Sequence, residues 1–190
     1  VLARELKALG YDWVCVSSGA LAVTLVGIAE FLHYRDVPGG PGVVKMIALG
    51  FETLFGALTI TGSFMAFGKL QGFIPGRPIT FPGQKLINAA VFFGAVGLYV
   101  ALVVTQSSGS TGDSGLIMFA VMTVLALVIG VTLVLPIGGA DMPVVVSLLN
   151  SYAGLAASAT GFAIGNNILI VAGALDGASG FILSILMSKA

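Results

Sequence analysis

The chain is built from long apolar stretches separated by short breaks that are polar or rich in glycine and proline. Six stretches contain about 20 mostly apolar residues, the length that a helix needs to cross a membrane. They span 13–32, 44–67, 86–105, 116–137, 143–164 and 168–187. This pattern predicts an all-α membrane protein with about six transmembrane helices in residues 13–190, forming part of a larger helical bundle. Residues 1–12 mix charged and apolar positions, which predicts an N-terminal extension or a short surface helix.

The breaks contain residues that end and begin helices. They lie at 38–42, 71–84, 106–114, 137–143 and 165–167. The fourth break is tight, and in it Asp141 is placed to cap the following helix while Pro143 occupies the first turn of that helix. The breaks therefore predict short connections between neighbouring helices.

Composition supports a membrane class and excludes others. Hydrophobic residues make up 57% of the chain and charged residues 8%, whereas a soluble domain carries about 25% charged residues. Eight basic residues balance eight acidic ones, so no basic patch is available for nucleic acid. The single cysteine, Cys15, has no internal disulfide partner, and no histidine and cysteine spacing indicates a metal site.

The basic residues predict an orientation through their excess on the cytoplasmic side. If the N-terminus is cytoplasmic, six basic residues lie on that side: Arg4, Lys7, Lys69, Arg77, Lys85 and Lys189. Only Arg35 and Lys45 lie on the other side. We therefore expect both termini of this segment to be cytoplasmic. As a separate expectation, the membrane is a bacterial inner membrane.

Three polar side chains lie inside apolar stretches. Glu52 and Asp176 each sit about 12 Å from the outer side, and Asn150 about 10 Å from the cytoplasmic side, at 1.5 Å per residue. A charge at such a depth costs at least about 2.5 kcal/mol unless it is paired, hydrated or protonated. One interpretation is a hydrated proton path in which Glu52 and Asp176 form a relay. The other is a pair of neutral acids, each hydrogen-bonded to a neighbouring helix.

The last two helices carry small and polar residues at intervals of three or four, which places them on one stripe of each helix. The fifth stretch has Ser147, Asn150, Gly154, Ser158 and Gly161, and the sixth has Gly173, Gly177, Gly180 and Ser184. Such stripes allow two helices to pack closely. A narrow wet seam is the alternative interpretation.

Two catalytic patterns are not supported. Ser179 lies in a Gly-x-Ser-Gly sequence like that of intramembrane serine proteases, but His33, the only histidine, lies far upstream at a helix end, so the serine lacks a base. The chain also has no Walker A sequence and no glycine-rich dinucleotide sequence after a strand. Any nucleotide chemistry must therefore belong to another domain or chain.

Three segments resemble a known family. They are Thr61–Gly72 (TGSFMAFGKLQG), Pro82–Ala89 (PGQKLINA) and, most specifically, Ile137–Tyr152 (IGGADMPVVVSLLNSY). Together with the glycines from Gly173 onward, they resemble the membrane domain of the proton-translocating NAD(P) transhydrogenase beta subunit. The resemblance covers roughly Leu21 to Ala190.

The resemblance implies a proton-translocating membrane domain that couples inward proton flow to hydride transfer between NADH and NADP. It implies that NAD and NADP bind to soluble partners, namely an NADP-binding domain after the last helix and an NAD-binding subunit, and not to this chain. It also implies further transmembrane helices, surrounding membrane lipid, and a homodimer of the full complex. This segment would carry no catalytic, cofactor-binding or metal-binding residue of its own.

The resemblance also implies roles for individual residues. Asn150 matches an asparagine of the proton path, and Asp141 matches an acid at its cytoplasmic mouth. Ser63 matches a small polar residue of the second helix, and Ser147 lies on the same stripe as Asn150. Gly173, Gly177, Gly180 and Ser184 match a closely packed last helix.

The chain departs from the family pattern in the first helix. The proton-path histidine of the family would fall near Val16, and His33 matches a position at a loop end instead. Glu52 and Asp176 stand where small or apolar residues are expected, so they are candidates to replace the histidine. Two other functions remain open on the residues alone: a small secondary transporter or channel that uses Glu52 and Asp176, or a structural membrane subunit.

Overall fold

The computed structural model describes residues 2–35, 42–80, 82–107 and 113–189, with side chains described except at 2–16, 35, 106–107 and 113. These ranges form six α-helices and one short 3₁₀ helix, η1, at Gly139–Asp141. The α-helices are α1 Leu2–Arg35, α2 Gly42–Leu70, α3 Gln84–Ser107, α4 Asp113–Val134, α5 Met142–Ile164 and α6 Asn167–Lys189.

The helices agree with the apolar pattern, and five of them, α2 to α6, are long and apolar enough to cross a membrane. The remaining predicted span, 13–32, is the first in the chain and lies within α1. This helix runs without a break from Leu2, so no turn separates residues 2–12 from the span. The chain is thus an integral membrane protein of the all-α class.

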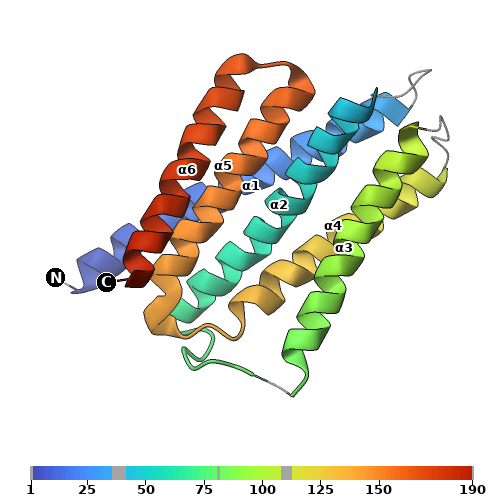
Figure 1. Ribbon diagram of the computed structural model, residues 1–190. Coiled ribbons are helices and arrows are strands. Elements are labelled where there is room, and N and C mark those ends of the chain that lie inside the picture. The colour runs from blue at the N-terminus through green and yellow to red at the C-terminus, as the bar shows by residue number, and fades with distance from the viewer. Residues whose placement is uncertain (1, 36–41, 81, 108–112, 190) are drawn as a thin grey trace.

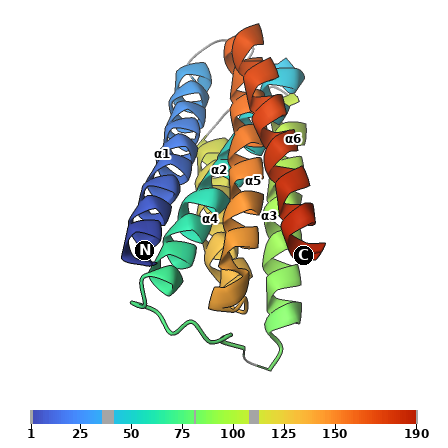
Figure 2. The ribbon, with the colours of Figure 1, turned by 90° about the vertical axis from the view of Figure 1, so that its left-hand side faces the viewer.

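The helices form a bundle in which α2 is central (Figure 1). α2 packs against α1, α3, α4 and α5, whereas α6 packs on α5 and α3 packs mainly on α4. Figure 2 shows that the N- and C-termini lie at the same end of the bundle. We call this end the termini end; the links 71–80 and 135–141 also lie there, and the α5–α6 turn lies at the opposite end (Figure 1).

The turn between α5 and α6 is short because Gly165 adopts a left-handed conformation, with φ +73°. A side chain would strain that conformation, which glycine accepts freely. The Asn166 Oδ1 then accepts hydrogen bonds from the backbone N–H groups of Ile168 and Leu169, at 3.0 and 3.2 Å. These bonds satisfy donors of the first turn of α6, so the chain reverses over two residues, Gly165 and Asn166.

Lys69 fixes the α4–α5 link to the end of α2 at the termini end. This residue is 4% exposed at the end of α2, and its ammonium donates hydrogen bonds to the carbonyls of Val134, Leu135 and Ile137. The first of these carbonyls belongs to the last turn of α4, where carbonyls lack partners in the helix and favour a cation. Lys69 therefore joins α2 to the link between α4 and α5.

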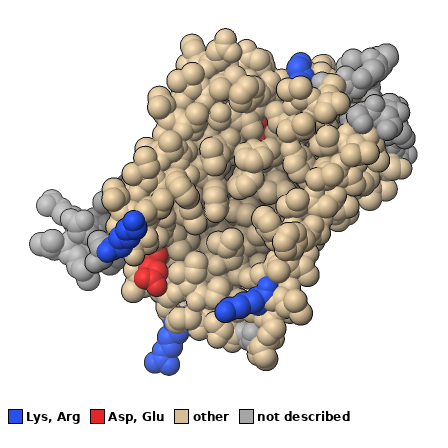
Figure 3. Space-filling model, viewed as in Figure 1, with Lys and Arg blue, Asp and Glu red and all other residues tan. Residues whose placement is uncertain are grey.

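Apart from Glu52 and Asp176, most of the charged side chains that the structure describes lie toward the ends of the helices. On the face shown in Figure 3, most of the basic and acidic atoms gather toward the termini end, and the middle of the face is almost entirely uncharged. An uncharged belt between charged ends is the arrangement that a lipid bilayer requires, because charges are costly in hydrocarbon.

Candidate functional site

The seam between α5 and α6 is lined by serine hydroxyls that donate across it. Ser147 donates to the Gly180 carbonyl at 2.9 Å, and Ser151 donates to the Gly177 carbonyl at 2.6 Å. Ser184 reaches back to Val144 at 3.4 Å. In a membrane, serine side chains commonly join helices in this way. Ser147, predicted in the proton path, thus makes its described hydrogen bond to the neighbouring helix.

Glycines make this close approach possible. A Cβ placed on Gly180 would lie 2.9 Å from the Ser151 nitrogen, and one on Gly173 would collide with the Ser158 backbone. A Cβ on Gly154 would lie 2.5 Å from the Gly177 nitrogen. The two predicted stripes therefore face each other with their backbones in contact. The packing interpretation of these glycines is the one that the geometry favours.

Asn150 and Asp176 meet on this seam. The Asn150 Nδ2 donates to the Asp176 Oδ1 at 3.2 Å, and the other carboxylate oxygen faces Gly154. Asn150 is half-buried, and Asp176 is exposed at the surface of the described bundle. The predicted proton-path asparagine is therefore paired with an acid that has one side open.

Glu52 occupies a different place, where α1, α2 and α5 come together. It is 0% exposed, and its carboxyl lies against Gly27 of α1, whose Cβ would be 2.6 Å from the Glu52 Oε1. The Thr160 side chain of α5 faces the carboxyl as well. Glycine at position 27 thus leaves the space that the carboxyl fills.

The neighbours of Glu52 offer it acceptors and not donors. The Thr160 hydroxyl donates to the Ala156 carbonyl at 3.1 Å, and the Thr53 hydroxyl donates to the Leu49 carbonyl at 2.8 Å. Since each hydroxyl has one proton to give, both retain only acceptor capacity toward Glu52. Among the residues that the structure describes, neither carboxyl oxygen of Glu52 receives a hydrogen bond. Such surroundings suit a carboxylic acid that keeps its proton and donates it.

The two acids do not share one environment. Asp176 contacts Asn150 and Gly154 on α5, whereas Glu52 faces Thr160, which lies six residues beyond Gly154. Six residues correspond to about 9 Å along the helix. The structure therefore does not bring Glu52 and Asp176 together, and a direct relay between them has no contact to support it.

Asp141 lies at the start of α5 as predicted, with Pro143 in the first turn, but the expected side-chain cap is wrong. Asp141 has φ −91° and ψ 2°, and its side chain makes no capping hydrogen bond. A capping side chain normally requires an extended backbone at that position, and η1 prevents it here. The carboxylate is therefore exposed at the termini end.

The remaining predicted residues have simple surroundings. Ser63 is 3% exposed on α2, and its hydroxyl has no hydrogen-bond partner in the described part of the chain. His33 is exposed near the end of α1, beside the Tyr34 ring. The side chain of Val16, where the family histidine was expected, lies outside the described residues.

Three participants were missed in the sequence. Gly27 and Thr160 complete the surroundings of Glu52 from helices that lie far from it in the chain. Lys69 was predicted only as a flanking cation. Threonine and glycine are ordinary residues of membrane helices, so neither carried a signal. The position of Lys69 at a helix end also hid its burial.

A family comparison matches most of the chain. The family model described as NAD(P) transhydrogenase beta subunit matches residues 13–190. The chain belongs to the NAD(P) transhydrogenase beta subunit family. The match begins at residue 13, earlier than the predicted start at Leu21, so the first membrane stretch is included.

Two curated relatives agree with the family assignment. Both are called NAD(P) transhydrogenase subunit beta, one from Rhodospirillum rubrum and one from its strain ATCC 11170, and each is 48% identical over 184 residues. The alignment covers 95% of this chain and 36% of each relative. This transhydrogenase beta segment therefore spans about a third of the length of the relatives it matches.

Proposed function

We propose that this chain is the proton-translocating membrane part of an NAD(P) transhydrogenase. In this proposal, proton flow through the bundle is coupled to hydride transfer between NADH and NADP on soluble domains outside this chain. The family match and the five membrane-spanning helices support the proposal. The observation that carries it is Glu52, a fully buried carboxyl inside an apolar helix.

The cofactors are assigned to partner domains because the described residues do not fit them. A dinucleotide normally lies across the carboxyl ends of parallel strands, and the described ranges contain helices only. When bound to those domains, NAD and NADP supply the hydride chemistry. The NADP-binding domain and the NAD-binding subunit of the same enzyme are therefore the proposed partners.

Glu52 is the proposed proton carrier, in place of the expected histidine. A protonated acid between α1, α2 and α5, with the Thr160 oxygen facing it as an acceptor, holds a proton without a buried charge. Loss of that proton leaves a carboxylate without a donor in the described surroundings, a costly state. A conformational change that brings a donor or water to Glu52 would release the proton.

Asn150 is proposed to position a proton path on the other side of α5. Its amide donates to Asp176, and its carbonyl oxygen remains an acceptor for water. Because an amide does not titrate, Asn150 orients the path, while Asp176 supplies the group that exchanges a proton. Ser147 and Ser63 are proposed as polar neighbours of this path.

Asp141 is proposed to face the NADP-binding domain. Its exposed carboxylate is not used to cap α5, so it is available for a contact outside the membrane. This arrangement requires the termini end to be cytoplasmic. The proposed location is a bacterial inner membrane, with the full complex as a homodimer.

Proton pumping by the complete complex in proteoliposomes tests the proposal. Glu52→Gln keeps the shape of the side chain but removes the exchangeable acid, so we expect pumping to fall at least about 100-fold, as for the loss of one acid–base group. Glu30→Gln is the matched control, because Glu30 is a half-buried acid of α1. Unchanged pumping in Glu52→Gln would exclude Glu52 as the carrier.

Asn150→Leu separates the two parts of the proposal. Leucine removes the hydrogen bond to Asp176 and the water acceptor, so we expect pumping to stop while the helices stay inserted. Asp176→Asn removes only the acid of that pair. If pumping survives both changes but not Glu52→Gln, the path passes Glu52 alone. The comparisons favour this function over a small transporter or channel, and over a purely structural subunit.

A further inference from the structure

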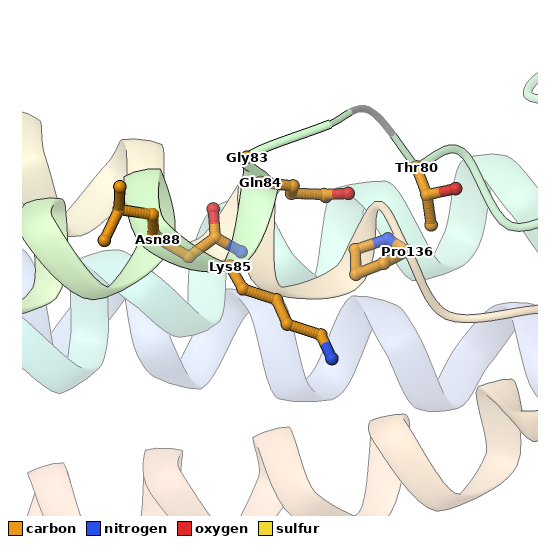
Figure 4. Close-up of a pocket in the computed structure, with 7 residues that line it drawn as sticks. Thr80, Gly83, Gln84, Lys85, Asn88 and Pro136 are labelled. Atoms are coloured by element: carbon orange, nitrogen blue, oxygen red, sulfur yellow. The ribbon is translucent and has the colours of Figure 1, made fainter.

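A pocket of about 480 Å³ opens beside the start of α3 at the termini end. It is formed by the first turns of α3, the link before them and the link after α4 (Figure 4). The labelled residues around it are Thr80, Gly83, Gln84, Lys85, Asn88 and Pro136. It is separate from the surroundings of Glu52 and from the α5–α6 seam, so the proposed proton function does not use it.

Two residues that line this pocket each carry a buried polar atom with no hydrogen-bond partner among the residues that the structure describes. The two atoms are the Gln84 Nε2, on a side chain that is 6% exposed, and the Asn88 Oδ1. The Asn88 Nδ2 donates to the Thr132 carbonyl at 3.2 Å, which fixes the amide and directs the oxygen elsewhere. Since the two residues are four apart on α3, a donor and an acceptor lie on one face, one turn apart. A buried polar group of this kind is costly without a partner, so the pair points to a ligand.

The charge of the pocket selects an anion. Lys85 is exposed at its edge, and none of the residues lining the pocket is acidic. Gly83, with φ +87°, turns the chain into α3, and the backbone N–H groups at the start of this 24-residue helix favour negative charge. A phosphate group matches these donors together with the Gln84 amide.

The surface next to the pocket is apolar. Leu86 is 77% exposed and Phe93 is 71% exposed on α3, and only 11% of the apolar stretch of this helix is buried in the bundle. A pocket whose wall includes Lys85 and two amide residues, and which opens onto an exposed apolar helix at the end of a membrane span, resembles the place of a lipid headgroup. A free phosphate ion would not use the apolar surface.

We propose that this pocket binds the headgroup of an anionic phospholipid whose headgroup carries a hydroxyl. The phosphodiester lies against Lys85, the start of α3 and the Gln84 amide. The headgroup hydroxyl donates to the Asn88 oxygen, and the acyl chains follow the exposed side of α3. Phosphatidylglycerol has these features.

Binding of short-chain phosphatidylglycerol to the detergent-purified complex, followed by native mass spectrometry, tests this site. Phosphatidylcholine of the same chain length is the neutral comparison, and inorganic phosphate is added as a competitor. We expect phosphatidylglycerol to bind more tightly than phosphatidylcholine and to resist displacement by phosphate. Lys85→Gln should weaken its binding about fivefold, the contribution of one basic residue near a membrane surface.

Gln84→Met and Lys189→Gln complete the design. Gln84→Met keeps the length of the side chain but removes the amide donor, so it should also weaken the binding of phosphatidylglycerol. Lys189 is an exposed lysine at the same end of the bundle but on α6, so Lys189→Gln should change nothing. Equal binding to Lys85→Gln and Lys189→Gln, or equal binding of the two lipids, would overturn the proposal. Displacement by phosphate that depends on Lys85 would identify a free-phosphate site and overturn the lipid assignment.

Discussion

Two helix pairs of the bundle use glycine in opposite ways. In the α5–α6 pair, the glycines of α6 at 173, 177 and 180 are buried, and their backbones touch α5. In the α3–α4 pair, Gly94 and Gly97 are exposed, and a Cβ on either would meet nothing within 4 Å. Glycines at intervals of three or four therefore indicate close packing only when a second helix presents a matching stripe.

The two pairs also differ in their buried side chains. Serine hydroxyls bridge α5 and α6. In α3 and α4, which also pack on other helices, the buried residues are mainly aliphatic or aromatic, and Asn88 donates across the pair to the Thr132 carbonyl. Close backbone contact makes the first pair intolerant of added volume. The second pair is held by side chains, which can shift to accommodate a change.

The largest expected effect comes from adding a side chain to a glycine of the seam. Gly173→Leu would place atoms against the Ser158 backbone and the Gly154 carbonyl, so we expect the free energy of unfolding to fall by about 3 kcal/mol. Reversible unfolding in mixed micelles, followed by circular dichroism, measures it. Gly94→Leu on α3 is the matched control and should change the free energy by less than about 0.5 kcal/mol. A similar loss in both variants would remove the distinction between the pairs.

The second prediction asks whether the two pairs are coupled at the termini end. Lys69→Met keeps the aliphatic stem but removes the ammonium donor from the Val134 carbonyl of α4 and from the Leu135 and Ile137 carbonyls of the α4–α5 link, so we expect the free energy of unfolding to fall by about 2 kcal/mol. The same unfolding assay measures it, with Lys189→Met as the exposed control. If Lys69→Met unfolds like the control, α2 does not hold the link between the pairs.

The smallest expected effect concerns a single hydroxyl. Ser151→Ala removes the hydrogen bond to Gly177, and such bonds between membrane helices average about 0.6 kcal/mol. Thr105→Ala on α3 removes a hydroxyl that bonds only within its own helix, so its loss should cost less. The free energies of unfolding of both variants, measured in the same mixed micelles, give the two losses for comparison. A larger loss in Thr105→Ala would contradict the bridging role of Ser151.

Apolar length and breaking residues were sufficient to predict the helices. The predicted stretches 44–67 and 143–164 became α2 at Gly42–Leu70 and α5 at Met142–Ile164. The small-residue stripes predicted the α5–α6 seam, because close backbone contact between helices requires small residues at intervals of three or four. The predicted boundary between residues 1–12 and the first span has no counterpart in the structure, since α1 continues through residue 13.

The neighbours of each polar residue were harder to predict. In a membrane, both lipid-facing and core-facing positions are apolar, so the pattern does not say which face of a helix is buried. Glu52 and Asp176 therefore looked equivalent in the sequence, although one is enclosed and the other is exposed. Lys69 looked like an ordinary interfacial cation because the carbonyls it bonds lie 65 to 68 residues away.

The two-residue turn at Gly165 and Asn166 has a consequence for the order of assembly. It keeps the sequence separation of the α5–α6 contacts short, and contacts between nearby segments close with the smallest loss of chain entropy. The surroundings of Glu52 instead combine residues from positions 27, 52 and 160, which are distant along the chain. We therefore expect α5 and α6 to pack on each other early, before the other helices dock on them. The buried acid becomes enclosed only when α1 and α2 dock on that pair, so its burial reports the completion of the whole bundle.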